Sequence, residues 1–207
     1  MTALIDYDAG NMRSVEKALR ALGDEPVITR DRETLLRADR VILPGVGAFR
    51  DCRNNLVNYG LDPVIREVIT AGTPFLGICV GMQLLFASSE EGKELCGGEL
   101  VPGLGIFPGG VRKIPDTPGL KIPHMGWNSL KITPGTRLLR GIPDGSYVYF
   151  VHSYCAEAAG QDFEAAETEY GMRVLAAVER DNVYATQFHP EKSSETGLRI
   201  LKNFLEM

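Results

Sequence analysis

The sequence has few of the features that mark membrane-spanning or nucleic-acid-binding proteins. Its 207 residues include four cysteines, three histidines and one tryptophan, and its basic residues never form a block. The longest apolar-looking run, residues 74–87, is interrupted by Gln83. It is shorter than the roughly 18 to 20 residues that a membrane-spanning helix needs. With 22 basic and 27 acidic side chains, the formal net charge of −5 does not indicate nucleic-acid binding.

We expect neither a secretion signal nor a disulfide framework. The first residues, MTALIDYDAGNM, carry Asp6 and Asp8, whereas a secretory signal has a basic start and an apolar middle. The cysteines lie at positions 52, 79, 96 and 155 without any CxxC pair, and this spacing does not suit a disulfide-rich fold. We therefore expect a cytoplasmic protein with free thiols, no cofactor and no metal site.

What is present is an ordinary globular composition, with 44% apolar and 24% charged residues. Strand-like and helix-like segments alternate through the first half. The apolar patterns predict strands over 2–7, 25–30, 39–45 and 73–79, and helices over 11–23, 31–38, 48–59, 61–71 and 80–87. Such alternation predicts right-handed crossovers and a mostly parallel sheet.

The pattern changes from about residue 95, where glycine and proline become frequent and predict loops around short strands, built as surface onto one sheet. Further strands are expected over 145–158, 164–171, 173–181 and 182–190, followed by a helix capped by Ser193 or Ser194. We expect a single three-layer α/β domain over 1–207. Its mostly parallel central sheet is flanked by helices, and a smaller antiparallel, loop-rich part lies in the second half.

Cys79 stands at a predicted strand-to-helix corner, in the sequence Gly77-Ile78-Cys79-Val80-Gly81. A nucleophile at such a corner is held out over the sheet edge, and glycines on both sides prevent collisions in the sharp turn, as in the G-x-S-x-G elbow of hydrolases. The N-terminus of the following helix would favour a thiolate. The alternative is a small buried side chain, a common role for free cysteine. The pentapeptide alone leaves both readings open.

A thiolate nucleophile needs a proton partner, and His189 is the best placed of the three histidines. It ends a strand-like run and is followed by Pro190 and Glu191. In an extended segment, residues i and i+2 share a face, so the Glu191 carboxylate can reach the His189 ring and fix its tautomer. A surface turn is the alternative for His-Pro-Glu. The pair gains weight from the Cys79 corner and the predicted parallel sheet.

Two further segments are candidates for function. The sequence VILPGVGAF, residues 41–49, places Gly45 and Gly47 after a predicted strand, where peptide N–H groups could bind an oxyanion. An ordinary glycine-rich turn is the alternative. The sequence PHMGWNSL contains Trp127. A lone tryptophan in a loop more often serves local packing, but tryptophan is also a typical interface anchor.

Together these segments resemble the class I, or triad, glutamine amidotransferases. Within that family the chain is most similar to the glutaminase subunits of imidazole glycerol phosphate synthase. The resemblance rests on six segments that span nearly the whole chain in the family's order: DYDAGNMRSV, LPGVGAF, GICVGMQLLF, HMGWN, YFVHSY and QFHPEKSS. Val80 stands where leucine is more usual in the family, which is a conservative departure.

The resemblance implies a set of roles. Cys79 would attack the carboxamide of L-glutamine to form a thioester. His189 would protonate the departing ammonia and then activate water, and Glu191 would orient His189. The remaining site residues would be Gln83 and Ser153 in substrate binding, and the peptides of Gly45, Val46, Gly47 and Val80 in an oxyanion hole.

The resemblance also implies a partner. In the family, ammonia passes to a separate (β/α)8-barrel cyclase subunit, in a heterodimer that makes imidazole glycerol phosphate and AICAR for histidine biosynthesis. Trp127, Asn128 and Lys192 match positions expected at that interface. We also expect no ammonia-accepting domain after residue 207, which favours a separate partner. We expect low activity of the isolated chain, with the PGVG backbone in an orientation that leaves the oxyanion hole incomplete.

Three other interpretations compete. The chain could be the glutaminase of another amidotransferase, serving anthranilate, purine, guanylate or pyridoxal phosphate synthesis. A peptidase or chaperone of the DJ-1/PfpI type would have histidine directly after the nucleophile, whereas Val80 follows Cys79 here. A non-catalytic regulatory subunit would have no reason to keep Cys79, His189 and Glu191 together.

Overall fold

A computed structural model describes residues 1–9, 11–158 and 162–207, so Gly10 of the first family motif lies outside the described residues. The helices are α1 (Met12–Ala21), α2 (Arg32–Leu36), α3 (Phe49–Asn58), α4 (Leu61–Thr70), α5 (Val80–Leu84) and α6 (Ser194–Leu205), with short 3-10 turns η1 (Lys93–Cys96) and η2 (Pro190–Lys192). Within the described ranges no helix is both long and apolar enough to cross a membrane.

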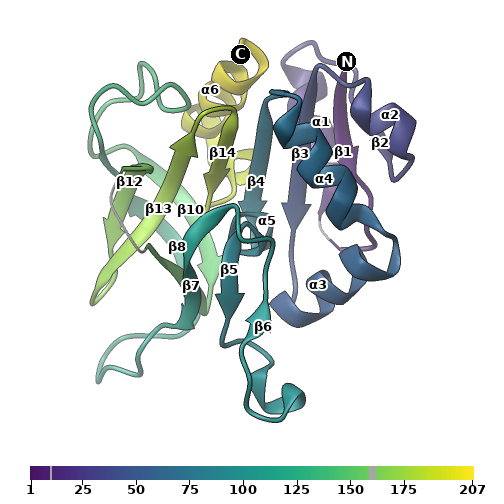
Figure 1. The fold of residues 1–207 in the computed structure, drawn as a ribbon. Helices are drawn as coiled ribbons and strands as arrows, with labels where there is room; N and C mark the ends of the chain where they lie inside the picture. Colours follow the sequence, from purple (N-terminus) through teal and green to yellow (C-terminus); the bar gives the residue numbers. More distant parts are fainter. Residues whose placement is uncertain (10, 159–161) are drawn as a thin grey trace.

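An eight-stranded sheet forms the centre of the molecule (Figure 1). Its strands, in spatial order, are β2 (Val27–Thr29), β1 (Thr2–Ile5), β3 (Arg40–Gly45), β4 (Phe75–Cys79), β14 (Val183–Thr186), β13 (Arg173–Arg180), β12 (Glu164–Glu169) and β9 (Lys131–Ile132). The first five strands are parallel, and the last three continue the sheet in antiparallel fashion. The expected α/β class with a mostly parallel central sheet is confirmed.

The central strands are buried on both faces, as the apolar sequences of β1, β3 and β4 predict. Helix α4 packs against α2 and α3, and α1 packs against α6, so helices cover the two faces of the sheet (Figure 1). Helix α1 shows why: Val15 and Leu19 are buried, whereas Glu16 and Arg20 form an ion pair at the surface. This packing fixes the parallel strands and the loops at their carboxyl ends.

The sequence after Cys79 folds differently from the prediction. The helix expected over 80–87 ends at Leu84, and β5 (Phe86–Ser89) follows. The carbonyl of Leu84 accepts a hydrogen bond from the N–H of Leu104, and the carbonyl of Ala87 accepts one from Gly103. Because residues 80–86 are all buried, their apolar pattern has no periodicity that could mark the end of the helix.

The glycine-rich middle of the chain was predicted to form surface loops built onto one sheet, but it contains a second sheet. Strands β5, β6 (Val101–Pro102), β7 (Phe107–Lys113) and β11 (Tyr154–Ala158) make a separate four-stranded sheet. The expected strand over 145–158 is broken at Ser153, so its first half, β10 (Tyr147–His152), pairs elsewhere. Local propensity could not show this division, because the two halves find partners far apart in the sequence.

Strand β10 pairs with β8 (His124–Ser129) in an antiparallel two-stranded ribbon. The side chains of the ribbon alternate in burial. Met125 and Trp127 are 61% and 50% exposed, and Tyr147 is 59% exposed, whereas His124 and Phe150 are buried. The ribbon therefore has an apolar outer face and an inner face that packs against the core.

The last helix starts where the sequence predicts, but the Ser193 side chain does not cap it. Its hydroxyl accepts a hydrogen bond from the N–H of Tyr149 at 2.9 Å and donates one to the carbonyl of His189 at 2.7 Å. Ser193 therefore joins the ribbon to the segment that follows β14. This tertiary role replaces the local capping role that the sequence suggested.

Candidate active site

The carboxyl ends of three neighbouring parallel strands meet at one edge of the sheet. Strand β3 ends at Gly45, which pairs directly with Cys79 at the end of β4, and β14 ends at Thr186 beside them. The loop after β3, the start of α5 and the segment 187–193 leave from these ends. Side chains from three distant parts of the sequence therefore converge here, as is usual for ligand sites of open α/β sheets.

The backbone at Cys79 is strained. Its φ of 55° and ψ of −109° are unusual for a residue with a Cβ atom, and such conformations typically cost about 1–3 kcal/mol. The turn is possible because its neighbours lack side chains. A Cβ on Gly77 would lie 2.8 Å from the carbonyl oxygen of Gly81, and a Cβ on Gly81 would collide with the carbonyl of Leu43. The glycines are therefore required by packing around the corner.

His189 and Glu191 form a buried pair beside Cys79. The Nδ1 atom of His189 lies 2.8 Å from Oε1 of Glu191, and the two side chains are 2% and 1% exposed. The backbone is extended at His189 but turns into η2 directly afterwards. The carboxylate therefore reaches the ring through a 3-10 turn and not along an extended strand, as the sequence suggested.

The second ring nitrogen of His189 is available for chemistry. Its Nε2 atom is buried and has no hydrogen-bond partner among the described residues. Burial opposes a charge on the ring, but interactions with the thiol of Cys79 and the carboxylate of Glu191 outweigh it and raise the pKa of His189 to about 9. The His189 ring therefore holds a proton at neutral pH, beside the sulfur of Cys79.

Gln83, one turn into α5, is fixed by two hydrogen bonds. Its Nε2 atom donates to the carbonyl of Tyr154 at 2.9 Å and to Oε1 of Gln187 at 3.0 Å. Nε2 of Gln187 in turn lies 3.7 Å from Sγ of Cys79. Gln187 and Tyr154 were not singled out in the sequence. Each belongs to a segment quoted above, YFVHSY or QFHPEKSS. Their hydrogen bonds to Gln83 join residues 71 and 104 positions apart, and neither segment indicated these contacts.

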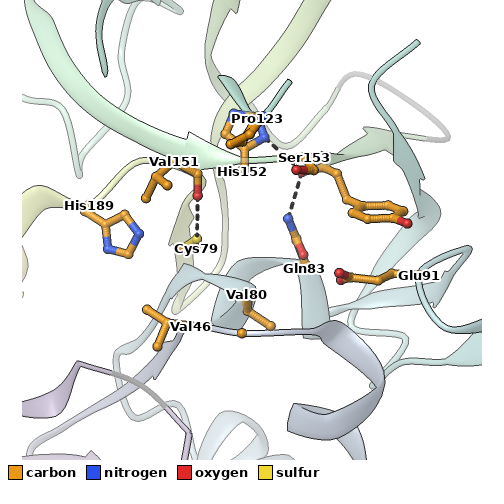
Figure 2. A pocket seen from close by; sticks show the side chains of 12 residues that line it. Val46, Cys79, Val80, Gln83, Glu91, Pro123, Val151, His152, Ser153 and His189 are labelled. Carbon is orange, nitrogen blue, oxygen red and sulfur yellow. Dashed lines mark hydrogen bonds between the residues drawn. The ribbon is translucent and has the colours of Figure 1, made fainter. Parts of the chain in front are cut away.

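A cavity of about 290 Å³ opens at this edge, near the lower limit for small-molecule sites. Figure 2 shows Cys79 with the His189 ring on one side and Gln83 and Glu91 on the other. Seven of the residues expected in the site line the cavity: Val46, Gly47, Cys79, Val80, Gln83, Ser153 and His189. Gly45 and Glu191 lie outside the lining, as do the expected interface residues Trp127, Asn128 and Lys192.

Glu91 is a wall residue that the sequence analysis missed. Burial raises the pKa of its carboxyl group, although a hydrogen bond from the N–H of Phe49 to Oε2, at 2.8 Å, opposes that shift. The carboxylate thus joins the cavity to the first residue of α3. In the sequence it belongs to a charged stretch, SSEEGKE, that carries no motif.

Two buried side chains hold carbonyl groups at the end of β3 and in the loop between β3 and α3. The hydroxyl of Tyr7 donates to the carbonyl of Pro44 at 2.7 Å, and the thiol of Cys52 donates to the carbonyl of Val46 at 3.5 Å. Gly47 adopts a φ of 103°, which favours glycine. The segment 44–47 therefore rests in one defined orientation, in which the carbonyl groups of Pro44 and Val46 accept hydrogen bonds from buried side chains.

Comparison with curated proteins gives full-length relatives. The chain is 52% identical over 207 residues to "Imidazole glycerol phosphate synthase subunit HisH" of Caldanaerobacter subterraneus subsp. tengcongensis, covering 100% of this chain and 98% of that protein. A protein of the same name from Geobacter metallireducens is 50% identical over 203 residues, covering 98% of this chain and 96% of that protein.

Solved structures share the fold at lower identity. A structure titled "Crystal structure of glutamine amidotransferase" aligns with a TM-score of 0.74 and 22% identity, covering 99% of this chain and 97% of that one. The structure of PurLQS from Thermotoga maritima aligns with a TM-score of 0.71, 20% identity and the same coverage. The family model for "Glutamine amidotransferase class-I" matches residues 3–207. The chain therefore belongs to the class I glutamine amidotransferase family.

Proposed function

We propose that residues 1–207 form the glutaminase subunit HisH of imidazole glycerol phosphate synthase. The chain would hydrolyse L-glutamine to glutamate and ammonia. The ammonia would pass to a (β/α)8-barrel cyclase subunit, which makes imidazole glycerol phosphate and AICAR in histidine biosynthesis in the cytoplasm. Full-length relatives of that name at about half identity support the assignment. The observation that carries it is the strained Cys79 corner facing the unpartnered Nε2 of a carboxylate-bound His189.

The first half of the reaction forms a thioester. The Cys79 thiolate attacks the carboxamide carbon of glutamine, and a C–S bond replaces the C–N bond. The departing nitrogen takes the proton on Nε2 of His189 and leaves as ammonia. Glu191, bound to Nδ1 at 2.8 Å, keeps the ring oriented and stabilises its charged form. The raised pKa of His189 suits this role, because the ring holds a proton at neutral pH.

The second half releases glutamate. His189, now neutral, takes a proton from water, and the hydroxide attacks the thioester carbonyl. The C–S bond breaks, glutamate leaves, and the proton restores the imidazolium beside the thiolate. Each tetrahedral intermediate carries a negative oxygen, which peptide N–H groups would stabilise. We assign these donors to the loop after β3 and to the peptide that follows Cys79, at Gly45, Val46, Gly47 and Val80.

The cavity is also suited to the amino-acid end of glutamine. We assign Gln83 and Ser153 to substrate binding, and we add Glu91. The partly buried Glu91 carboxylate is the acidic group of the cavity wall, so it would pair with the substrate α-ammonium. A fixed charge pair in a cavity of this size would select an α-amino acid over a simple amide.

We further propose that the outer face of the β8–β10 ribbon docks the cyclase. Trp127 is half exposed, with Met125 and Tyr147 beside it on the same face, and large apolar groups gathered in this way indicate an interaction surface. Lys192 lies in η2, next to the catalytic pair. Trp127 and Lys192 would thus contact the cyclase, and Asn128, on the inner face of β8, would connect docking with the site.

The isolated chain would have low activity. Tyr7 and Cys52 hold the carbonyls of Pro44 and Val46 in the resting loop. We propose that this loop must change orientation before its N–H groups complete the oxyanion hole, and that docking of the cyclase provides the change. Ammonia would then be produced only when the acceptor is in place.

Glutamate release tests the proposal. The purified chain is assayed alone and with a cyclase subunit plus its ribonucleotide ligand. We expect weak activity alone, strong stimulation in the complex, and complete loss in Cys79→Ala, with the half-exposed Cys96→Ala as a matched control. Activity that ignores the cyclase would assign the chain to another amidotransferase. No activity in either condition would favour a non-catalytic subunit.

The docking assignment needs its own test. Trp127→Ala and Lys192→Ala should each weaken the affinity for the cyclase, measured by titration calorimetry, by about tenfold or more. Val27→Ala, on the opposite edge strand β2, and Lys202→Ala, on the exposed side of α6, serve as controls for apolar area and charge. Affinities of Trp127→Ala and Lys192→Ala equal to those of the controls would refute the assignment.

A further inference from the structure

A continuous chain of buried and partly buried hydrogen bonds runs from the inner face of β8 to the cavity. The amide of Asn128 lies 3.3 Å from Nε2 of His124, whose Nδ1 lies 3.0 Å from Nε2 of His152. The Nδ1 atom of His152 lies 2.9 Å from the carbonyl oxygen of Tyr154. That carbonyl also accepts the Gln83 amide, at 2.9 Å. The Tyr154 carbonyl is thus the junction between this chain and the site.

The direction of every bond follows from the two ends. A carbonyl oxygen only accepts, so Nδ1 of His152 carries the proton, and Nε2 of the neutral ring accepts from Nδ1–H of His124. Nε2 of His124 then accepts from the Asn128 amide. That amide is fixed independently: it also donates to the carbonyl of Glu169 at 2.9 Å, and its Oδ1 accepts from the N–H of Ser129 at 2.8 Å. The two ends of the chain therefore agree on one set of tautomers.

The surroundings keep both rings neutral and in place. Burial lowers the pKa of His124 to about 4 and that of His152 to about 3. The His124 ring is stacked between Phe150 and Tyr170, with ring centroids 4.6 Å and 3.9 Å away. A protonated ring would place two N–H groups against each other and break the chain.

The chain continues beyond its junction to the sulfur. Both N–H groups of the Gln83 amide are used, one on the Tyr154 carbonyl and one on Gln187, whose own amide lies 3.7 Å from Sγ of Cys79. At the other end, His124 and Asn128 alternate along β8 with Met125 and Trp127 of the exposed outer face. A shift of β8 is therefore passed through a few directional bonds to the side chains around the nucleophile.

We propose that His124 and Asn128 are positioning residues for the Cys79 site, acting through His152 and the Tyr154 carbonyl on the orientation of Gln83. The inference rests on the proposed glutaminase function and adds a route by which a partner on the outer face of β8 adjusts that site. A merely structural buried pair would affect stability alone. A positioning pair also affects the turnover of the folded complex, at unchanged affinity for the partner.

Substitutions at His124 separate the two roles. His124→Phe keeps the stacking and removes both hydrogen bonds, whereas His124→Asn places an amide donor where Nδ1 stood. We expect His124→Phe to lower the kcat of glutamate release in the complex by about tenfold, the effect of one lost buried hydrogen bond. His124→Asn should recover most of that loss. Tyr170→Phe, which keeps the stack and loses only the bond to the Lys121 carbonyl, is the matched control.

The outcomes are distinct. Equal kcat values for His124→Phe and Tyr170→Phe would overturn the inference, as would a loss in His124→Phe that His124→Asn does not reduce. Absence of glutamate release by the unmodified complex would instead refute the proposed function. The heterodimer affinity and the melting temperature are measured alongside. We expect the affinity to match that of Tyr170→Phe. The melting temperature should be lower, because His124→Phe leaves Nε2 of the buried His152 without a donor, so kcat is compared at a temperature at which both variants are folded.

A measurement on the unmodified protein keeps the inference testable if His124→Phe does not fold. The 15N shifts of the histidine rings report which nitrogen carries the proton. We expect the Nδ1–H tautomer for both His124 and His152 at pH 7. An Nε2–H tautomer, or a charged ring, at either position would break the chain and overturn the inference.

Discussion

The glycines around Cys79 predict a graded response to one added methyl group. In a helix such as α5, Gly81→Ala would normally stabilise the fold by up to about 1 kcal/mol. Here the new Cβ would collide with the main-chain carbonyl of Leu43, and on Gly77 it would lie 2.8 Å from the carbonyl oxygen of Gly81. Contacts under 3.0 Å are almost never found for real Cβ atoms. Because the obstacles are backbone atoms, β3, β4 and α5 must move apart.

The magnitude follows from the contacts. Overpacking of this kind costs about 1–3 kcal/mol and more where nothing can give way. We expect Gly81→Ala to lower the free energy of unfolding by about 3 kcal/mol, which corresponds to about 6–12 °C in melting temperature for a chain of this length. Gly77→Ala should cost about 1–2 kcal/mol. Gly110→Ala in β7 is the control, because its Cβ would meet only Ser88, at 3.4 Å and 3.5 Å.

Denaturant unfolding followed by circular dichroism measures the series, and glutamate release in the complex measures its effect on the site. Glutaminase activity should be lowest in Gly81→Ala, higher in Gly77→Ala and unchanged in Gly110→Ala. The reason is that a closer contact of the added Cβ displaces Cys79 further from its position relative to His189. A Gly81→Ala variant within 1 kcal/mol of the unmodified protein, with Gly110→Ala equally stable, would refute the packing explanation of the corner.

Three other predictions concern titration and the support of the site. The kcat/KM of glutamate release should fall as the pH rises through about 9, where His189 loses its proton, and Glu191→Gln should move this decline to lower pH. Burial lowers the pKa of His124 and His152 in the folded protein, whereas in the unfolded chain each ring has the usual histidine pKa of 6.5. The free energy of unfolding should therefore decrease as the pH falls below about 6.5, by up to ~1.4 kcal/mol per pH unit for each ring. Denaturant unfolding at a series of pH values measures this decrease. Ser193→Ala leaves the partly buried N–H of Tyr149 without its partner and removes one of the two hydrogen bonds to the His189 carbonyl; it should lower the free energy of unfolding by about 1–3 kcal/mol.

The parts of the site that lie within one short segment could be predicted from the sequence. The Cys79 corner follows from an apolar strand that ends between two glycines, and His189 and Glu191 are only two residues apart. The contacts that bring Gln187 and Glu91 into the site could not be predicted in this way, although Gln187 stands two residues before His189. The Gln83–Gln187 hydrogen bond joins residues 104 positions apart. Glu91 reaches the cavity because the chain after α5 continues into β5 of the separate four-stranded sheet.

In the fold, too, the elements set by local sequence pattern could be predicted, whereas those set by tertiary contacts could not. The alternating elements of the first half could be predicted because each carries its own apolar period, as α1 and β4 do. The end of α5 could not, because residues 80–86 are buried on every side. Nor could the separate sheet of β5, β6, β7 and β11, in which pairing is decided by tertiary contacts between glycine-rich segments. Ser193 is a further case: its hydroxyl serves the ribbon and His189 instead of capping α6.

The most direct test of the central claim is the covalent intermediate itself. The complex is mixed with glutamine, quenched in acid, digested and analysed by mass spectrometry. We predict that the peptide containing Cys79 gains the mass of glutamine minus ammonia, and that the peptides containing Cys52, Cys96 and Cys155 do not. Glutamate release without a modified Cys79 peptide, or with equal modification of all four cysteines, would contradict the assignment of Cys79 as the nucleophile.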